Sequence, residues 1–529
     1  MGQGIHSDSS SDDNSSRKIT TKVRSGIVSK GRKLFSLSLI VMAMSGCAVT
    51  SQPISKEQSE QRIQQDKVAM FSKQEPVTAP ITLYDAMARA LKYNLEARLK
   101  VMEQALSQQQ LELARYDMLP QMAMSAGYVG RSNTSASSSR SIETGRQSLE
   151  PSTSLDRNRD VADLTMVWNV LDFGVSYVSA KQKADQRWIA DERKRKVVHT
   201  IIQDVRSAYW RAVAAERLLG RIDSLIDRVN QAREASEHMS TQQVGDPVEA
   251  LSYRRALIDA VRQLEEQRRA LSLAKTELAT LMNLPLDTPY SLALPNSNDM
   301  PVPQLNVDFN TLEQTALLSR PELKEQDYQV RVHAAETRKS LLRMLPGLEV
   351  SAGGHYDSNS FMVNQSWADV GVKVTWNLFN LLSGPAAYKT AQANEKVSEV
   401  QRQAMSLAVM AQLYIARANF NEAVRQYKTS VELRDLDGQI AEQLRNRYKA
   451  NSIGELQLIQ GELNALNANL RQDLAYAELR NTYGQILSTV GLDLLPKTLP
   501  SDRLADISQA LRQSETNWQQ GKIGALQSF

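Results

Sequence analysis

Residues that could support catalysis are sparse in this chain of 529 residues. Five histidines are present, and none of them stands at the spacing that metal-binding motifs use. They are His6, His199, His238, His333 and His355. Walker A, H-E-x-x-H and G-x-S-x-G patterns are also missing, and pairing along helices explains the many acidic residues. We therefore do not expect an enzyme, and we expect no catalytic, metal-binding or cofactor-binding residue.

The single cysteine, Cys47, has surroundings that point to a covalent modification. Basic residues precede an apolar run at 34–44, and small residues follow it, which is the order of a secretory signal peptide. Residues 44–47 resemble a bacterial lipobox, with Met where Leu is usual. We therefore predict removal of residues 1–46 and lipidation of Cys47, with palmitate among the acyl chains; the alternative is an ordinary buried thiol. Ala48, where an Asp would retain a lipoprotein in the inner membrane, fits the outer membrane.

The net positive charge of the chain comes from its N-terminal segment. The formal net charge of the whole chain is +4, and residues 1–46 alone carry the same net charge. The remainder is therefore neutral, which is not the footprint of a nucleic-acid binder, and we expect no nucleic-acid partner. The basic run at 193–196 follows two acidic residues inside a helical pattern, so it is predicted to be a solvated helix face.

The chain repeats itself. Leu119-Pro120 matches Leu345-Pro346 at an offset of 226 residues, and Trp168-Asn169 matches Trp376-Asn377 at an offset of 208. Two offsets that hold over many residues indicate two copies of one unit. In order, the predicted parts are a signal peptide (1–46), an acylated polar lead-in (47–80), a first repeat (81–295), a second repeat (305–496) and a polar C-terminal tail (497–529).

Helical patterns account for most of each repeat. The first helix is predicted at 82–117 in one copy and at 309–344 in the other, and each ends before a proline. Longer helices are predicted at 176–240 and 385–450, each about 95–100 Å long at 1.5 Å per residue. A turn signal and a return helix follow each of them. No run of about 20 apolar residues interrupts this pattern, which excludes a bundle of transmembrane helices.

Two short runs of alternating apolar and polar residues stand between the helices of each repeat, as in strands with one apolar and one polar face. Each run is about ten residues, the length of a tilted strand that crosses a membrane. Four strands cannot close a barrel, because open edges in lipid leave backbone groups unpaired. We therefore expect several subunits to pool strands around a wet lumen; the alternative is a soluble sheet half buried on the helices. The predicted strands lie at about 121–130, 161–170, 347–356 and 367–376.

The ordered set of motifs resembles the TolC family of outer-membrane efflux proteins. The set comprises Leu-Pro before the first strand of each repeat, Trp-Asn-Val-Leu-Asp-Phe-Gly at 168–174 and Ser-Arg-Pro-Glu-Leu at 319–323. The resemblance covers about 80–500. It implies a mainly α fold with a small transmembrane β part, in which a homotrimer forms a 12-stranded β-barrel, four strands per chain, continuous with a long periplasmic α-helical barrel.

The resemblance also implies partners and a location. The chain would sit in the outer membrane, in contact with its lipid, with a periplasmic extension and a lipid anchor. It would dock to a periplasmic adaptor (membrane fusion) protein and to an inner-membrane transporter of the RND or ABC type. No cofactor is implied.

Two functional regions are implied near the turns before the return helices. The turns themselves would contact the adaptor, and residues just after the second turn would form the pore constriction, where the family often has Asp. Here Gln457 and Gln460 take that place, and Glu249 is the first-repeat equivalent of Gln457. A glutamine ring would close the pore by hydrogen bonds without a fixed charge, and Arg445, Arg447 and Tyr448 nearby would form latching hydrogen bonds between helices. The adaptor-contact residues would be Val244, Gly245, Asp246, Ser452, Ile453 and Gly454.

Three functions are compatible with the sequence. The first is a passive exit duct for small molecules in a tripartite efflux system. The second keeps the duct but assigns it to type I protein secretion. The third is a periplasmic coiled-coil scaffold or adaptor without a pore. Acylation favours the first over the second, and strands of membrane-spanning length favour both over the third.

Overall fold

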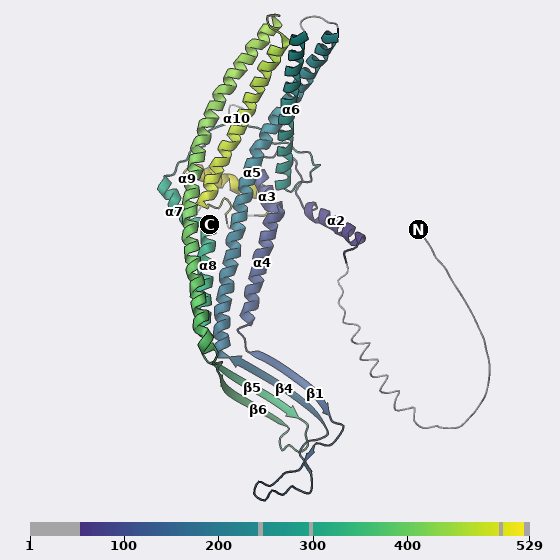
Figure 1. Ribbon diagram of the computed structural model, residues 1–529, viewed down its shortest axis with the longest axis vertical. Coiled ribbons are helices and arrows are strands. Elements are labelled where there is room, and N and C mark those ends of the chain that lie inside the picture. The colour runs from purple at the N-terminus through teal and green to yellow at the C-terminus, as the bar shows by residue number, and fades with distance from the viewer. Residues whose placement is uncertain (1–52, 242–246, 296–299, 497–500, 523–529) are drawn as a thin grey trace, which may run out of the picture. The chain divides into compact units, whose positions relative to one another are not determined.

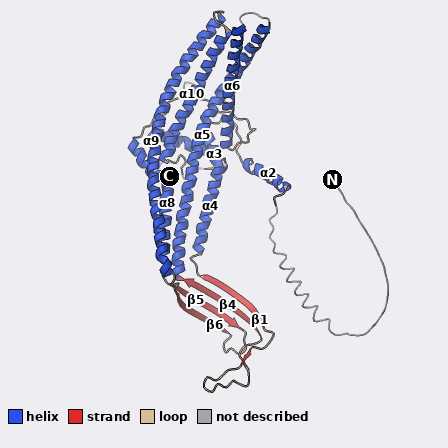
Figure 2. Ribbon diagram, in the orientation of Figure 1, coloured by secondary structure: helices blue, strands red, loops and turns tan. Residues whose placement is uncertain are grey.

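The computed structural model describes residues 53–241, 247–295, 300–496 and 501–522. They divide into one unit that ends at Ala69 and a larger unit that starts at Met70. The first unit holds most of α2 (Lys56–Phe71), a helix with no buried residue. The larger unit contains the sheet, the long helices and the core (Figures 1 and 2). The predicted signal peptide and Cys47 lie outside the described residues.

Each repeat opens with two helices, so the prediction of a single helix was wrong. Asn94 and Arg320 interrupt the pattern with extended backbone. The side-chain oxygen of Asn94 accepts hydrogen bonds from the backbone N–H of Glu96 and Ala97, which caps the second helix of the first pair. Pro321 starts the second helix of the other pair, a position where its missing N–H costs nothing. The helices are α3 (Leu83–Tyr93), α4 (Leu95–Tyr116), α7 (Phe309–Ser319) and α8 (Pro321–Leu342).

Two very long helices run through the larger unit, and each is followed by a return helix. α5 has 72 residues and α9 has 70, so each is about 105 Å long at 1.5 Å per residue. Both begin earlier than predicted, close behind the strands. None of the helices in the described ranges combines the length and hydropathy that crossing a bilayer requires. The four helices are α5 (Val170–Thr241), α6 (Pro247–Leu281), α9 (Asn380–Lys449) and α10 (Glu455–Val490).

The four expected strands form one antiparallel sheet in the order β1-β4-β5-β6 (Figure 2). Each repeat supplies one pair of neighbours, and the pairing of β4 with β5 joins the two repeats. β1 and β6 each have a neighbour on one side only, so the sheet has two free edges. The loop between β1 and β4 carries a small ribbon of β2 (Ala136–Ser137) and β3 (Ser152–Thr153). The strands are β1 (Gln121–Gly130), β4 (Asn158–Asn169), β5 (Gly347–Asp357) and β6 (Ser366–Thr375).

The register of the sheet separates an apolar face from a polar one. Trp168 pairs with Val350, and Val350 pairs with Val372, so these three side chains share a face. The edge strands extend this face with Met124 and Val370, each 79% exposed. A continuous apolar surface of this kind is typical of a face that lies against lipid or another subunit.

The core of the larger unit lies where α3, α5, α10 and α11 (Leu504–Gln519) meet. Trp210 packs edge-to-face on Tyr476, with ring centroids 5.0 Å apart. α11 belongs to the segment expected to be a polar tail, yet it buries Ile507, Leu511 and Trp518. The polar composition of that segment concealed an amphipathic helix.

A buried cluster of charges fastens α11 to both repeats. Glu515 of α11 accepts hydrogen bonds from Arg206 of α5, at 3.1 and 3.0 Å, and from Arg480 of α10, at 2.9 Å. Arg206 and Glu515 are each 1% exposed. Burial by itself raises the pKa of Glu515, but the two guanidinium groups outweigh this effect and hold the pKa below its ordinary value.

A second cluster fixes the end of the second repeat against the middle of α5. Asp493 lies 3.0 Å from Nε of Arg195 and 2.9 Å from Nε2 of His199. Burial raises the pKa of Asp493, but the hydrogen bond from His199 and the charge of Arg195 together hold it below its ordinary value. Just before Asp493, Gly491 takes a φ of +75°, which ends α10 in the left-handed region that suits glycine.

We expect Glu515→Gln to destabilise the protein by about 3–5 kcal/mol, because it leaves two buried guanidinium groups without their carboxylate. Thermal unfolding of the detergent-solubilised protein, followed by circular dichroism, measures this change. Glu143→Gln, in the exposed loop between β1 and β4, is the matched control and should leave the midpoint unchanged. Equal midpoints for the two variants would contradict the structural role of the buried cluster.

Asp493→Asn should destabilise the protein by about 1–3 kcal/mol at pH 7, through loss of charged hydrogen bonds. Because the folded pKa of Asp493 is lowered, its contribution is present above the ordinary pKa of Asp and disappears as pH falls through the lowered value. The gap between variant and parent midpoints should therefore narrow from pH 7 toward pH 2. A gap that stays constant with pH would show that the carboxylate charge is not what stabilises this junction.

Candidate functional site: hairpin tips and interhelical latch

The turn between α9 and α10 is compact and closed by backbone hydrogen bonds. The N–H of Ser452 donates to the carbonyl of Arg447 at 2.9 Å, and the N–H of Asn451 donates to the carbonyl of Tyr448 at 2.9 Å. Asn451 takes a φ of +53°. This arrangement is a Schellman-type helix end, which satisfies the last carbonyls of α9.

The predicted adaptor-contact residues of this turn lie at its outer end. Ser452 and Gly454 are exposed, and Ile453 is half-buried. The φ of Gly454, −78°, is ordinary, and Asn451 supplies the left-handed residue of the turn. Gly454 is the N-cap residue of α10, and a side chain added there would point into open space. The three residues are therefore available to a partner.

The first tip is described only in part. Val244, Gly245 and Asp246 lie outside the described residues, between the end of α5 and the start of α6. Glu249 belongs to α6, but its side chain also lies outside what the structure describes.

Gln457 and Gln460 lie in the first two turns of α10 and share one face of the helix, since they are three residues apart. Both are exposed and make no hydrogen bond to another described residue. Leu458 and Ile459, between them, are 5% and 1% exposed, and Ile459 belongs to the core of the helical hairpins. The two amides are thus held on the free side of α10 by apolar packing on its other side.

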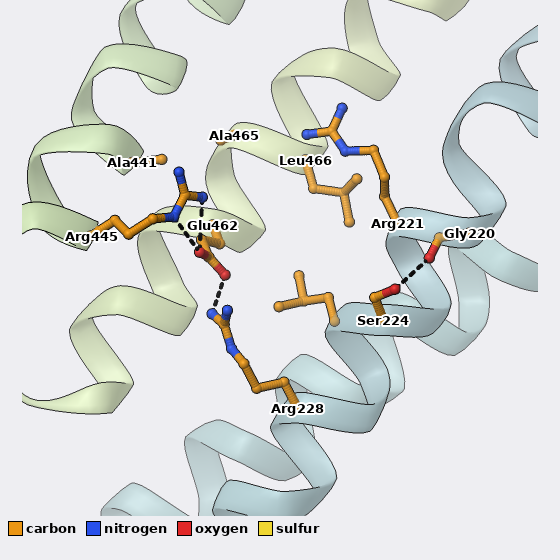
Figure 3. Close-up of a pocket in the computed structure, with 10 residues that line it drawn as sticks. Gly220, Arg221, Ser224, Arg228, Ala441, Arg445, Glu462, Ala465 and Leu466 are labelled. Carbon is orange, nitrogen blue, oxygen red and sulfur yellow. Dashed lines mark hydrogen bonds and ion pairs between the residues drawn. The ribbon is translucent and has the colours of Figure 1, made fainter. Parts of the chain in front are cut away.

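One carboxylate ties three helices together two turns from this tip (Figure 3). Glu462 of α10 accepts hydrogen bonds from Arg445 of α9, at 3.0 and 3.3 Å, and pairs at short range with Arg228 of α5. We call these three residues the latch. The carboxylate is 14% exposed, while Arg228 and Arg445 are 35% and 49% exposed. The pair with Arg228 joins the hairpin of the first repeat to that of the second.

The latch borders a cavity of about 280 Å³ between α5, α9 and α10. Arg221 points toward the same cavity from α5 (Figure 3). Further along, Arg217 of α5 donates to Asp473 of α10 at 2.8 Å, and Gln267 of α6 donates to Asn467 of α10. A row of polar contacts therefore crosses between the two hairpins.

Sequence reasoning found only part of this site. Of the three residues expected to latch helices, Arg445 does bond to α10, whereas Arg447 and Tyr448 contribute backbone carbonyls that close the turn. Arg228 and Glu462 were missed, because ion pairs between distant segments leave no signal in spacing along the chain. The one sequence signal was the position of Glu462, an acidic residue three places after the apolar Ile459 in the same predicted helix.

Comparisons by sequence find no matching family model and no matching curated protein. Comparison of structures gives clear likenesses. The Campylobacter jejuni outer-membrane channel CmeC has a TM-score of 0.61 and 14% sequence identity, over 84% of this chain and 94% of that one. The open state of the Neisseria gonorrhoeae outer-membrane channel MtrE has a TM-score of 0.58 and 19% identity, over 76% and 88%.

A third solved structure, CusC, described in connection with transmembrane channel formation, has a TM-score of 0.60 and 16% identity, over 80% of this chain and 96% of that one. These neighbours are channel proteins and not enzymes. At such identities the likeness shows the fold. The chain therefore has the TolC-type fold of these outer-membrane channels, as its resemblance to that family implied.

Proposed function

We propose that the protein is the outer-membrane channel of a tripartite efflux system, a passive exit duct for small molecules across the outer membrane and the periplasm. The observation that carries this proposal is the four-stranded sheet with one apolar face and two free edges, joined directly to helices about 105 Å long. In a periplasmic scaffold without a pore, the apolar face and the free edges of this sheet would both be exposed to water. The likeness to outer-membrane channels supports the same conclusion.

A homotrimer would give each free edge of the sheet a neighbouring strand to hydrogen-bond with. In each copy, β1 and β6 lack a neighbour on one side. Pairing β6 of one copy with β1 of the next closes the ring, and three copies supply 12 strands, which is within the range of known membrane barrels. The apolar face would then lie against lipid, and the polar face would line the lumen.

The helices carry matching signs of self-association. Leu99, Met102 and Leu106 of α4 are exposed and recur at intervals of three and four. Leu407 and Tyr414 of α9 are exposed and recur after seven residues. Both spacings are those of a coiled-coil seam, and although Tyr414 packs edge-to-face on Phe309 of α7, with ring centroids 4.6 Å apart, all five side chains are exposed in the single chain. Contacts between neighbouring copies would bury both seams.

The remaining partners follow from the two ends of the duct. The turns at 244–246 and 452–454 would contact a periplasmic adaptor protein, which would link the duct to an inner-membrane transporter of the RND or ABC type. At the other end, acyl chains on Cys47 would add a lipid anchor in the outer membrane, since each buried CH₂ contributes about 0.8 kcal/mol.

The constriction would form where α10 begins. Gln457 and Gln460 lie on the exposed face of that helix, with Glu249 expected beside them from the first repeat. In a trimer these residues would be brought together three times around the pore axis. The latch would set the position of this helix end relative to α5.

The proposal predicts heat-sensitive trimers in detergent and single-channel conductance in planar bilayers. A protein that stays monomeric and does not conduct after reconstitution would contradict it.

Val372→Arg, on the apolar face, should impair membrane insertion by about 2–4 kcal/mol, because it places a charge against lipid. Thr375→Arg, on the opposite face of the same strand, is the matched control and should still insert and conduct.

Replacing Gln457 and Gln460 together by Ala should raise single-channel conductance, because it widens the predicted constriction and removes its hydrogen-bonding groups. The control is the double variant of two exposed glutamines away from the tip, Gln401→Ala with Gln403→Ala, which should conduct like the parent. Unchanged conductance in the first double variant would move the constriction elsewhere in the duct.

A further inference from the structure

The polar face of the sheet contains a cluster of side chains from all four strands. His355 of β5 lies between two carboxylates: its Nδ1 is 2.7 Å from Oδ1 of Asp163 on β4, and its Nε2 is 3.2 Å from Oδ2 of Asp369 on β6. Trp367 of β6 stacks on the imidazole, with ring centroids 5.1 Å apart. Ser125 of β1 donates to Asp163 at 3.2 Å, so all four strands take part.

A glycine makes this geometry possible. Gly353 lies two residues before His355 on the same face and pairs with Asp369. A Cβ at this position would lie 2.5 Å from Nε2 of His355 and 2.9 Å from Oδ1 of Asp369. The imidazole therefore extends along β5 over the missing side chain to reach the third strand.

The other charges on this face cancel. Arg159 forms an ion pair with Asp357, and Glu349 stands opposite Lys373 in the register. The alternation of the four strands places no further charged residue on this face. Its net charge is therefore set by the cluster alone: two negative charges per chain when His355 is neutral, and one when it is protonated.

We propose that Asp163, His355 and Asp369 form the charge-selecting element of the pore, which favours cationic over anionic solutes, and that the protonation of His355 sets its strength. This inference rests on the proposed function, because it needs an aqueous lumen lined by the polar face. A ring of carboxylates around a pore attracts cations and repels anions. The element lies in the sheet, far along the chain from the glutamines of the predicted constriction.

The ligand of this element is a mobile cation and not a resident metal. Among the residues that the structure describes, no group of three or more His, Cys, Asp or Glu side chains is arranged to hold a metal ion. The imidazole instead occupies the space between the two carboxylates. Around it, the facing groups are Asp163 from β4, Asp369 from β6 and the uncharged Ser125 and Trp367.

The test is the reversal potential of the reconstituted trimer in a KCl gradient, measured from pH 5 to pH 9. Carboxyl groups ordinarily titrate below this range, and histidine titrates within it. The ratio of potassium to chloride permeability should rise roughly twofold across the range, as loss of the imidazole proton doubles the net negative charge of the face.

Two variants separate the contribution of the imidazole from that of the two carboxylates. His355→Gln should remove the dependence on pH and hold the permeability ratio near the high-pH value of the parent. Asp163→Asn with Asp369→Asn should lower the ratio toward that of an uncharged pore. His333→Gln, the same substitution on α8, is the matched control and should keep the pH dependence of the parent.

The outcomes distinguish the two proposals. A parent protein that does not conduct overturns the proposed function. A conducting parent whose permeability ratio does not change with pH, or a His355→Gln variant that keeps the parental pH dependence, overturns the charge-selecting role and leaves the duct in place. Loss of the pH dependence in the His333→Gln control would place charge selection in the helices and would also overturn it.

Discussion

Backbone hydrogen bonding at the two free edges of the sheet is the constraint on which the structure depends. A sheet of four strands offers unpaired N–H and C=O groups along β1 and β6, and the side chains of its apolar face are exposed in the single chain. Such edges are costly in lipid, where nothing else can bond to them. The repeat explains how one chain supplies these strands: each copy of the unit gives one antiparallel pair, and the pairing of β4 with β5 joins the copies.

The helices extend the same arrangement away from the sheet. α5 starts directly after β4, and four residues separate β6 from the start of α9, so the geometry of the sheet fixes where the helical wall begins. Buried ion pairs then hold the repeats together where the helices pack: Glu515 joins two arginines from different repeats, and Asp493 ties the end of α10 to α5. These contacts join the two repeats in the middle of the larger unit.

Local patterns in the sequence predicted the elements and missed the contacts between distant segments. Period-two runs predicted the strands, because one face of each strand is mainly apolar. The break at Asn94 was missed, because a capping asparagine inside a helical pattern looks like a solvent-facing residue. α11 was missed because its apolar residues are few and widely spaced. The pairing of His355 with Asp163 and Asp369 depends on register, which no spacing along the chain reveals. The lipidation of Cys47 and the roles of Gln457, Gln460 and Glu249 stay predictions.

The latch has a consequence for the energetics of moving the two hairpins apart. Glu462 is held by Arg445 of its own hairpin and by Arg228 of the other. If the hairpins separate, only Arg228 leaves, and its partly exposed guanidinium is readily hydrated by water. Glu462 keeps its ion pair with Arg445 throughout, so no unpaired carboxylate is left in a poorly hydrated position. An unpaired buried charge is what makes breaking a buried ion pair costly. At the latch itself, separation therefore exchanges one arginine for water, while the Arg217–Asp473 ion pair and the apolar packing of Ile459 and Leu466 hold the two hairpins together elsewhere.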